Sequence, residues 1–435
     1  MKILFVAPSA YLLGGVQDWL SQLIPDLRSR GFDVTVAVPD GSHHLYKAYS
    51  EKYSELNPKP FHNPTGSAWG RVRSLCRLLL EQSPDMVVGV NIGDIYTAVR
   101  EMRRNKIFAG RVVMTIHAIE SDYFNDLAHQ IDVVDAVIAT NRLTCSLAHC
   151  QALVPRERIF YAPYGVPVSS RIPSKSDTSN LLHVAWAGRF DHSQKRIYDL
   201  VEILKKLDTY DVRYQLSLAG DGPERERVET QLEPWVSNGK VNLLGRLSKE
   251  KLQRDVFASH HVLLITSSWE TGPIVAWEAM AAGMAVVSSK YVGSGMEDAL
   301  KDGRTALLFP VGDSSSAAQH IAQLHSPKLF RLLSEHGYQL VLDRFSSQAS
   351  NQAWFDALES VADLPHLPCP VADMPLPMSG RLDRWFGVLL ADKVRRLFKL
   401  GQKHRSAGGE WPHAVHGSAN NDSFFLEASQ LDFHG

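Results

Sequence analysis

Two acidic residues, Glu270 and Glu278, lie eight positions apart around a short apolar segment. Pro273 suits the first turn of a helix, where a missing backbone N–H costs no hydrogen bond, and Gly272 before it allows a ligand to approach the backbone closely. The helix expected from Ile274 to Ala282 is apolar on nearly every side, so it should be buried. An unpaired carboxylate is costly there, and no Lys or Arg is adjacent in the sequence. Hydroxyl groups of a ligand would satisfy Glu278; the alternative is a core helix flanked by two solvated acids.

The segment Glu270-x7-Glu278, followed by Ala-Met-Ala-Ala-Gly, resembles the signature of the family 4 glycosyltransferases, and the likeness extends over roughly residues 1–360. It implies the GT-B fold and retention of the anomeric configuration. In that family the second Glu holds the ribose of a nucleotide-sugar and the first contacts the donor sugar. Backbone N–H groups between them contact the sugar or phosphate, and the candidate donor-binding backbone here is Gly272, Pro273 and Ile274. The third motif position is often aromatic, where this chain has Gly272.

Two cations, Arg189 and Lys195, follow the end of an expected strand, with Gly188 immediately before them. A glycine at a strand end, nearby cations and a helix N-terminus suit a diphosphate. In the resembling family an Arg and a Lys at these positions grip the donor diphosphate. Such cations would act on charge that develops on the leaving nucleoside diphosphate in the transition state. The family usually has Gly where this chain has Arg196, and the alternative is two solvated surface cations.

Further candidate residues come from the resemblance. Gly220 begins a turn like the family's Gly-x-Gly-Pro turn near the nucleotide, and Arg246 lies in a segment whose backbone reads the base. Glu297 matches a Gly-x-Glu turn beside the donor, although it could equally be an acid at a helix N-terminus. Gly15 belongs to a double glycine that approaches the diphosphate and acceptor. His117 resembles a His that contacts the donor sugar, but a lone histidine at a strand end is more often structural.

The composition describes a globular protein. Hydrophobic residues make up 44% of the 435 residues and the formal charge is −1, which argues against general nucleic-acid binding. No run approaches 18 apolar residues, and the first residues lead directly into a strand rather than a signal peptide. No Asp-x-Asp triad or His/Cys cluster is present, so we expect no metal and no cofactor, the nucleotide-sugar being a substrate. The four cysteines fit reduced cytoplasmic thiols; they are Cys76, Cys145, Cys150 and Cys369.

Short apolar strands alternate with helices along two stretches of the chain, which predicts two Rossmann-like α/β domains. Because the sequence also resembles GT-B glycosyltransferases, we expect the parallel sheets of the two domains to face a central cleft. The region 41–60 is expected to be a loop on the acceptor side. The expected strands are 2–8, 32–38, 85–90, 111–116, 135–139 and 158–162, then 182–187, 213–219, 241–244, 261–266, 285–289 and 306–309.

A polar segment at 171–180 predicts a linker between the two domains. Residues 1–170 would form the acceptor-side domain and residues 181–345 the nucleotide-sugar-binding domain. The resemblance implies that a helix at 346–361 crosses back onto the first domain. Ligands of open parallel sheets lie outside the carboxyl ends of the strands, where all the candidate residues fall.

The leading hypothesis is retaining transfer of a sugar from a nucleotide-diphosphate donor to a cytoplasmic acceptor, such as a lipid-linked or surface-polysaccharide precursor. Alternatives are a GT-B nucleotide-sugar epimerase and a transferase-like binding subunit that has lost activity. The intact candidate residues argue against the last. The sequence does not indicate the donor base, the sugar, the acceptor or the oligomeric state.

The tail, residues 362–435, lies beyond the resemblance. Segment 363–379 is rich in Pro and predicts an extended connector, and 401–435 is expected to be largely disordered. Residues 380–400 predict a helix with one apolar stripe and a basic opposite face. Such a helix fits an anionic membrane surface, which would make the protein peripheral at the inner face of the membrane. The alternative is docking of the stripe on its own protein or on a second subunit. The apolar residues are Leu382, Trp385, Phe386, Leu389, Leu390, Val394, Leu397 and Phe398.

Overall fold

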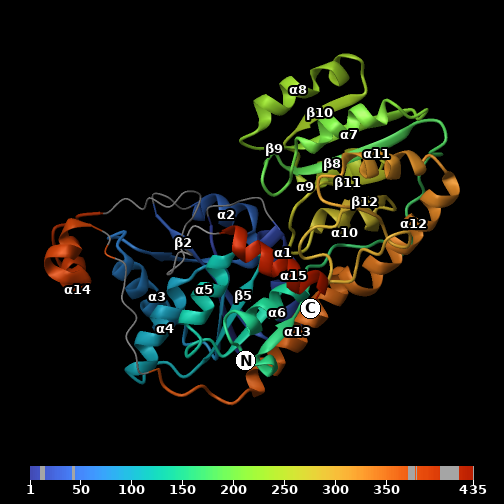
Figure 1. Cartoon of the computed structure of the whole chain (residues 1–435). Helices are drawn as coiled ribbons and strands as arrows, with labels where there is room; N and C mark the ends of the chain where they lie inside the picture. The colour runs from blue at the N-terminus through green and yellow to red at the C-terminus, as the bar shows by residue number, and fades with distance from the viewer. Residues whose placement is uncertain (10–14, 42–44, 371–377, 379, 402–420, 435) are drawn as a thin grey trace. The chain divides into compact units, whose positions relative to one another are not determined.

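The computed structural model describes the chain except residues 10–14, 42–44, 371–377, 379, 402–420 and 435 (Figure 1). The chain divides into two compact units, each built around its own sheet. The first unit comprises Met1–Thr140, Thr144–Ala162 and Asn351–Phe424. The second comprises Asn141–Leu143, Pro163–Ser350 and Phe425–Gly435.

The first unit contains a seven-stranded parallel sheet in the order β3-β2-β1-β4-β5-β6-β7. The interior strand β1 is apolar throughout its buried part, as expected for a strand covered on both faces: Ile3 pairs with Val34 on one side and Met86 on the other. The strands are β1 (Lys2–Val6), β2 (Asp33–Asp40), β3 (Lys59–His62), β4 (Met86–Gly89), β5 (Arg111–Ile116), β6 (Ala136–Ala139) and β7 (Ile159–Tyr161).

Helices connect these strands, as parallel pairing requires. They are α1 (Gly15–Ser29), α2 (Tyr46–Lys52), α3 (Ala68–Gln82), α4 (Asp94–Arg104), α5 (Ser121–His129) and α6 (Arg142–Cys150). Helix α13 (Ser347–Asp363) returns to this unit, where the ring of Trp354 lies 4.5 Å from that of Trp19 on α1. Phe355 of the same helix stacks on Phe32 at 5.3 Å.

The second unit contains a six-stranded parallel sheet in the order β10-β9-β8-β11-β12-β13. Its strands are β8 (Leu182–Arg189), β9 (Tyr214–Asp221), β10 (Val241–Gly245), β11 (Val262–Ile265), β12 (Ala285–Ser289) and β13 (Leu307–Phe309). Its helices are α7 (Asp199–Leu207), α8 (Arg225–Ser237), α9 (Lys249–Lys251), α10 (Ile274–Ala281), α11 (Ser314–Gln323) and α12 (Pro327–Leu340). The expected two-sheet α/β architecture is confirmed.

One expected loop is wrong. The region 41–60 contains helix α2 and the beginning of strand β3. The strand lies at the edge of the sheet and only Phe61 is buried in it, so its polar sequence gives no apolar run. An edge strand with one buried side chain can be as polar as a loop.

The tail contains α14 (Arg381–Leu397) and α15 (Asn421–His434). The expected disorder of 401–435 is therefore wrong for residues 421–434. The expectation of one continuous helix over 380–400 is wrong, because Gly387, with φ 71° and ψ 161°, breaks α14 into two helical stretches. Residues 365–370 have no helix, in agreement with an extended connector; 371–377 and 379 lie outside the described residues. In the part of the chain that the structure describes, no helix is long and apolar enough to cross a membrane.

Candidate active site

The structure brings Lys195 and Glu270 together at the carboxyl end of the second sheet. The Lys195 ammonium lies 2.5 Å from Glu270 Oε1, and the Ser267 hydroxyl donates to the same oxygen at 2.5 Å. The Thr266 hydroxyl donates to the Lys195 carbonyl at 2.6 Å, which joins the loop after β8 to the loop after β11. Lys195, which is expected to bind the diphosphate, and Glu270, which is expected to bind the sugar, thus form an ion pair with each other.

Arg189, the last residue of β8, is exposed, and no salt bridge involves it within the described residues. The loop that follows is shaped by Asp191, whose carboxylate accepts a 2.7 Å hydrogen bond from the Gln194 N–H. The structure therefore leaves Arg189 turned to solvent while it pairs Lys195 with Glu270. Both cations still belong to the same strand-to-helix connection.

Glu278 is buried in α10, and Lys249 Nζ lies 3.1 Å from its Oε1. The sequence analysis missed this cation because it lies 29 positions earlier in the chain. Ser248 accepts a hydrogen bond from the Lys251 N–H and so begins a helix directly after β10, which carries Lys249 to the same sheet edge. The sequence signal that could have found Lys249 was the helix start that follows the strand expected to read the base. Arg246, in the connection between them, is exposed.

Helix α10 begins immediately after Pro273, whose carbonyl accepts from the N–H groups of Ala276 at 2.7 Å and Trp277 at 3.3 Å. The first N–H groups of a helix have no acceptor within the helix, so those of Ile274 and Val275 are suited to an anionic ligand. Gly272, before the helix, has no side chain to cover them.

Gly188 and Gly220 lie opposite each other at the ends of β8 and β9. A Cβ on Gly220 would lie 1.9 Å from the Gly188 carbonyl oxygen, so the strand ends can approach this closely only with glycine there. A Cβ on Gly188 would lie 3.7 Å from Lys195 Cε. Gly188 therefore leaves the backbone bare beside the Lys195 side chain, while Gly220 allows the two strand ends to pack closely.

Glu297 is buried and forms a 2.9 Å ion pair with Arg344. Residues 298–301 are turns and irregular structure, so the alternative interpretation of Glu297 as an acid at a helix N-terminus is wrong. Tyr291 lies close to Glu270, Glu297 and Asp432. Burial first, and then these three negative charges, raise the pKa of the Tyr291 hydroxyl well above its ordinary value, so it remains protonated.

Asp432 of α15 was missed by the sequence analysis. Its buried carboxylate accepts backbone hydrogen bonds from Gly293 at 2.7 Å, Gly295 at 3.0 Å and Met296 at 2.8 Å. The Phe425 ring of the same helix lies 4.4 Å from that of Trp269, beside Glu270. The turn that bears Glu297 is thus held by the C-terminal helix. No periodic pattern could reveal a carboxylate that binds backbone 136 to 139 positions away.

Replacing Asp432 with Asn should lower the free energy of unfolding by about 1.5–3 kcal/mol, because an amide N–H₂ would face one of three N–H donors. Asp422→Asn, at the exposed start of the same helix, is the matched control and should cost at most about 1 kcal/mol through the helix dipole. Urea unfolding measures both. Equal stabilities of the two variants would contradict a stabilising role for the Asp432 contacts.

In the first unit, Gly15 is the first residue of α1, and Gly14 lies outside the described residues. His117, just beyond β5, is buried, with its Nε2 2.9 Å from the Thr115 hydroxyl and its ring 5.0 Å from that of Trp19. Burial lowers the pKa of His117 to about 3, so the imidazole is neutral at physiological pH. The neutral imidazole can form a hydrogen bond with a ligand but carries no charge.

This neutral histidine should make the chain less stable in acid. The pKa of His117 is about 3 in the folded state against 6.5 for an ordinary histidine, so the unfolded state takes up its proton first. Stability should then fall as the pH drops below about 6.5, by about 2 kcal/mol at pH 5 from this residue alone. Urea unfolding at pH 7 and pH 5 should show a smaller loss of stability in His117→Asn than in wild type. His129→Asn, an exposed histidine on α5, should keep the wild-type dependence; equal dependences in both variants would contradict the assignment.

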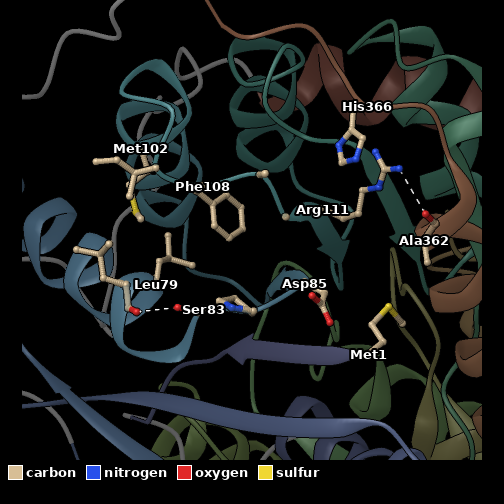
Figure 2. A pocket seen from close by; sticks show the side chains of 14 residues that line it. Met1, Leu79, Ser83, Asp85, Met102, Phe108, Arg111, Ala362 and His366 are labelled. Carbon is tan, nitrogen blue, oxygen red and sulfur yellow. Dashed lines mark hydrogen bonds between the residues drawn. The ribbon is translucent and has the colours of Figure 1, made fainter.

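A cavity of about 450 Å³ in the first unit lies away from these residues (Figure 2). Met1, Asp85 and Arg111, which line it, lie at or immediately before the amino ends of β1, β4 and β5. Ligands of open parallel sheets bind at the opposite, carboxyl edge. We therefore assign no donor role to this cavity.

Among the described residues, no three His, Cys, Asp or Glu side chains form a group that could hold a metal ion.

Two family models match the chain. Residues 13–170 match Glycosyltransferase Family 4, and residues 182–326 match Glycosyl transferases group 1. N-acetyl-alpha-D-glucosaminyl L-malate synthase of Bacillus anthracis is 30% identical over 155 residues, which cover 35% of this chain and 39% of that protein. A PP-undecaprenol alpha-1,4-N-acetyl-D-galactosaminyltransferase of Campylobacter jejuni is 26% identical over 42% of this chain and 48% of its own length. The chain thus spans less than half the length of these two relatives.

Solved structures share the fold. The lipopolysaccharide outer core galactosyltransferase WaaB superposes with a TM-score of 0.68 at 18% identity, over 83% of this chain and 99% of its own. Anabaena HepE in complex with UDP and glucose gives 0.67 at 19% identity, over 83% and 100%. These structural neighbours are GT-B glycosyltransferases. The two matching models place the chain among the family 4 glycosyltransferases, and the likeness to the solved structures shows the GT-B fold.

Proposed function

We propose that this protein is a retaining glycosyltransferase that moves a sugar from a nucleoside-diphosphate sugar to a cytoplasmic acceptor without a metal ion. The observation that carries the proposal is the Lys195–Glu270 ion pair at the edge of the sheet that also carries Glu278. A cation for phosphate and acids for sugar and ribose are what a nucleotide-sugar requires. Gly188 has no side chain beside Lys195, which lets the diphosphate approach the backbone there.

Each residue has a distinct role in this proposal. Arg189 and Lys195 stabilise the negative charge that develops on the leaving diphosphate, aided by the free N–H groups at the start of α10. Glu270 binds hydroxyls of the donor sugar, and Glu278 binds the ribose. Lys195 exchanges its contact with Glu270 for the phosphate, which frees the carboxylate for the sugar. The reaction is a front-face substitution through an oxocarbenium-like state, with no protein nucleophile assigned.

The names of relatives suggest the substrates to test first. HepE has been solved with UDP and glucose and with UDP-glucose, so uridine donors are the first choice. The Campylobacter relative is named for a sugar linked to PP-undecaprenol, and WaaB for the lipopolysaccharide core. We therefore propose an acceptor that is a lipid-linked or surface-polysaccharide precursor.

A thermal-shift panel of nucleoside diphosphates tests the donor site. A ligand at 100 times its Kd should stabilise the folded protein by about 2.7 kcal/mol. One base should stand out, and the shift should not need a divalent cation, since EDTA should leave it unchanged. A shift that appears only with added Mn²⁺ or Mg²⁺ would contradict the metal-free proposal. No shift with any nucleotide would favour a binding subunit without a donor site.

Product NMR tests the stereochemistry once a donor is known. The anomeric configuration of the donor should be kept in the product, as the family implies, and inversion would contradict the proposal. Incubation of the donor without acceptor should give only slow hydrolysis. Rapid release of an epimerised free sugar would indicate the nucleotide-sugar epimerase instead.

A further inference from the structure

Segment α14 consists of two helical stretches that break at Gly387 (φ 71°), and the buried ion pair between Asp383 and Arg395 joins one stretch to the other. The segment turns charged residues toward the protein and large apolar residues toward solvent, the reverse of an ordinary surface helix. The buried charged residues are Asp383, Asp392 and Arg395. The apolar face of α14 is formed by residues that are 50 to 77% exposed; these are Trp385, Phe386, Leu389, Leu390, Leu397 and Phe398. Figure 1 shows α14 at the margin of the first unit.

The orientation of α14 is fixed by its buried acids. Asp392 Oδ1 accepts hydrogen bonds from the hydroxyls of Thr65 at 2.6 Å and Ser67 at 3.0 Å, and its Oδ2 accepts from Arg73 Nε at 3.0 Å. Ser67 is also the N-cap of α3, so the helix is attached to the beginning of α3. Turning the apolar face inward would break all three contacts. The sequence therefore favours the outward orientation of the apolar face.

The pairing of the acids also decides the charge of the outer surface. Asp383 forms a buried 2.6 Å ion pair with Arg395, and Asp392 is occupied by its contacts to α3. Both acids of this segment are thus turned inward. The exposed charged residues of the segment are all cations, which we call the basic rim; they are Arg381, Arg384, Lys393, Arg396 and Lys399.

We propose that α14 docks on the surface of an anionic lipid bilayer, with its apolar face among the headgroups and its basic rim on the phosphates. Trp, Phe and Leu beside Arg and Lys are the composition of helical segments that lie at a membrane interface. A second copy of the chain fits less well. A two-fold contact through the apolar face would bring one basic rim against another, and like charges would repel.

This inference rests on the proposed function only to explain why membrane binding would help the enzyme. A lipid-linked acceptor lies at a membrane surface, so an enzyme held there meets its substrate at a higher local concentration. Vesicle binding needs neither donor nor acceptor. The two proposals can therefore fail separately: a protein that binds vesicles without transferring sugar would keep the first and refute the second.

Sedimentation of the full-length chain with vesicles tests the docking surface. We expect binding to phosphatidylcholine vesicles that contain phosphatidylglycerol, little binding to pure phosphatidylcholine, and weaker binding at high salt. Replacing Arg384, Lys393 and Lys399 with Gln should weaken partitioning about fivefold per charge, or about a hundredfold together. The matched control, with Lys205, Arg254 and Lys301 replaced by Gln, removes the same charge from the second unit and should leave binding within about threefold.

The apolar face is tested by Trp385→Ala, Phe386→Ala and Leu389→Ala together, which should abolish binding to anionic vesicles. Leu80→Ala with Leu332→Ala, two exposed leucines elsewhere, is the control. All these side chains are exposed, so the fold should survive, and near-UV circular dichroism checks it. Absence of vesicle binding, or binding that the α14 variants leave unchanged, would overturn the proposal. A lipid-independent dimer in sedimentation equilibrium that the apolar variant converts to monomer would assign the face to a second copy instead.

Discussion

Replacing Arg189 or Lys195 with Ala should lower kcat by about 10²- to 10³-fold, which is the usual cost of removing one donor to charge that develops in the transition state. Arg189 is the exposed last residue of β8 and Lys195 lies in the connection after it, both outside the core, so the variants should fold. Turnover is measured at saturating donor, so that weaker binding does not enter the rate. Lys205→Ala, an exposed cation on α7, is the matched control and should keep wild-type turnover.

The two variants should differ in one respect, because only Lys195 is paired with Glu270. Lys195→Ala removes the cation and also leaves the Glu270 carboxylate with Ser267 as its remaining neighbour among these contacts. Arg189→Ala leaves the ion pair intact. We therefore expect the larger loss for Lys195→Ala. If either variant turned over like wild type with its donor, the assignment of that residue to the diphosphate would be wrong.

The sheets were predictable because their signal is local. Each buried strand is a short apolar run between turn residues, as in β5 and β12, and such runs can be read without knowing their neighbours. Strand β3 was missed for the same reason, since an edge strand with one buried residue has no such run. The candidate residues after β8 and β11 came from their local residue types and the family resemblance, and they fall at the strand carboxyl ends, where ligands bind.

Pairing could not be predicted, because partners lie far apart in the sequence. Lys249 reaches Glu278 from 29 positions away, and Asp432 reaches Gly293 from 139. The pattern of 380–400 predicted a helix with two faces but did not say which face meets the protein. That depends on Thr65, Ser67 and Arg73, which receive Asp392. In each case the residue types were visible and the contact was not.

The roles of the two glutamates should separate when each is replaced with Gln. Glu278→Gln should weaken free nucleoside diphosphate as well as nucleotide-sugar, by about 10- to 100-fold, because the ribose is common to both and hydrogen bonds to a charged group contribute about 1.5–3 kcal/mol. Lys249→Gln is the matched control: it removes the partner of Glu278 but keeps the carboxylate, so the ribose should still bind. Calorimetry measures the affinity for the nucleoside diphosphate in wild type, Glu278→Gln and Lys249→Gln.

Glu270→Gln should leave the free nucleoside diphosphate within about twofold of wild type and reduce sugar transfer. The structure gives the sign of any small change, because the substitution removes the negative charge that holds Lys195 at 2.5 Å and makes the ammonium more available to the phosphates. Nucleotide affinity should therefore stay equal or rise while kcat falls. Equal losses of nucleotide affinity in Glu270→Gln and Glu278→Gln would refute the division, since both carboxylates would then act on the part of the donor that remains after transfer. A loss confined to Glu278→Gln places the ribose at α10 and leaves Glu270, with Lys195, at the bond that breaks.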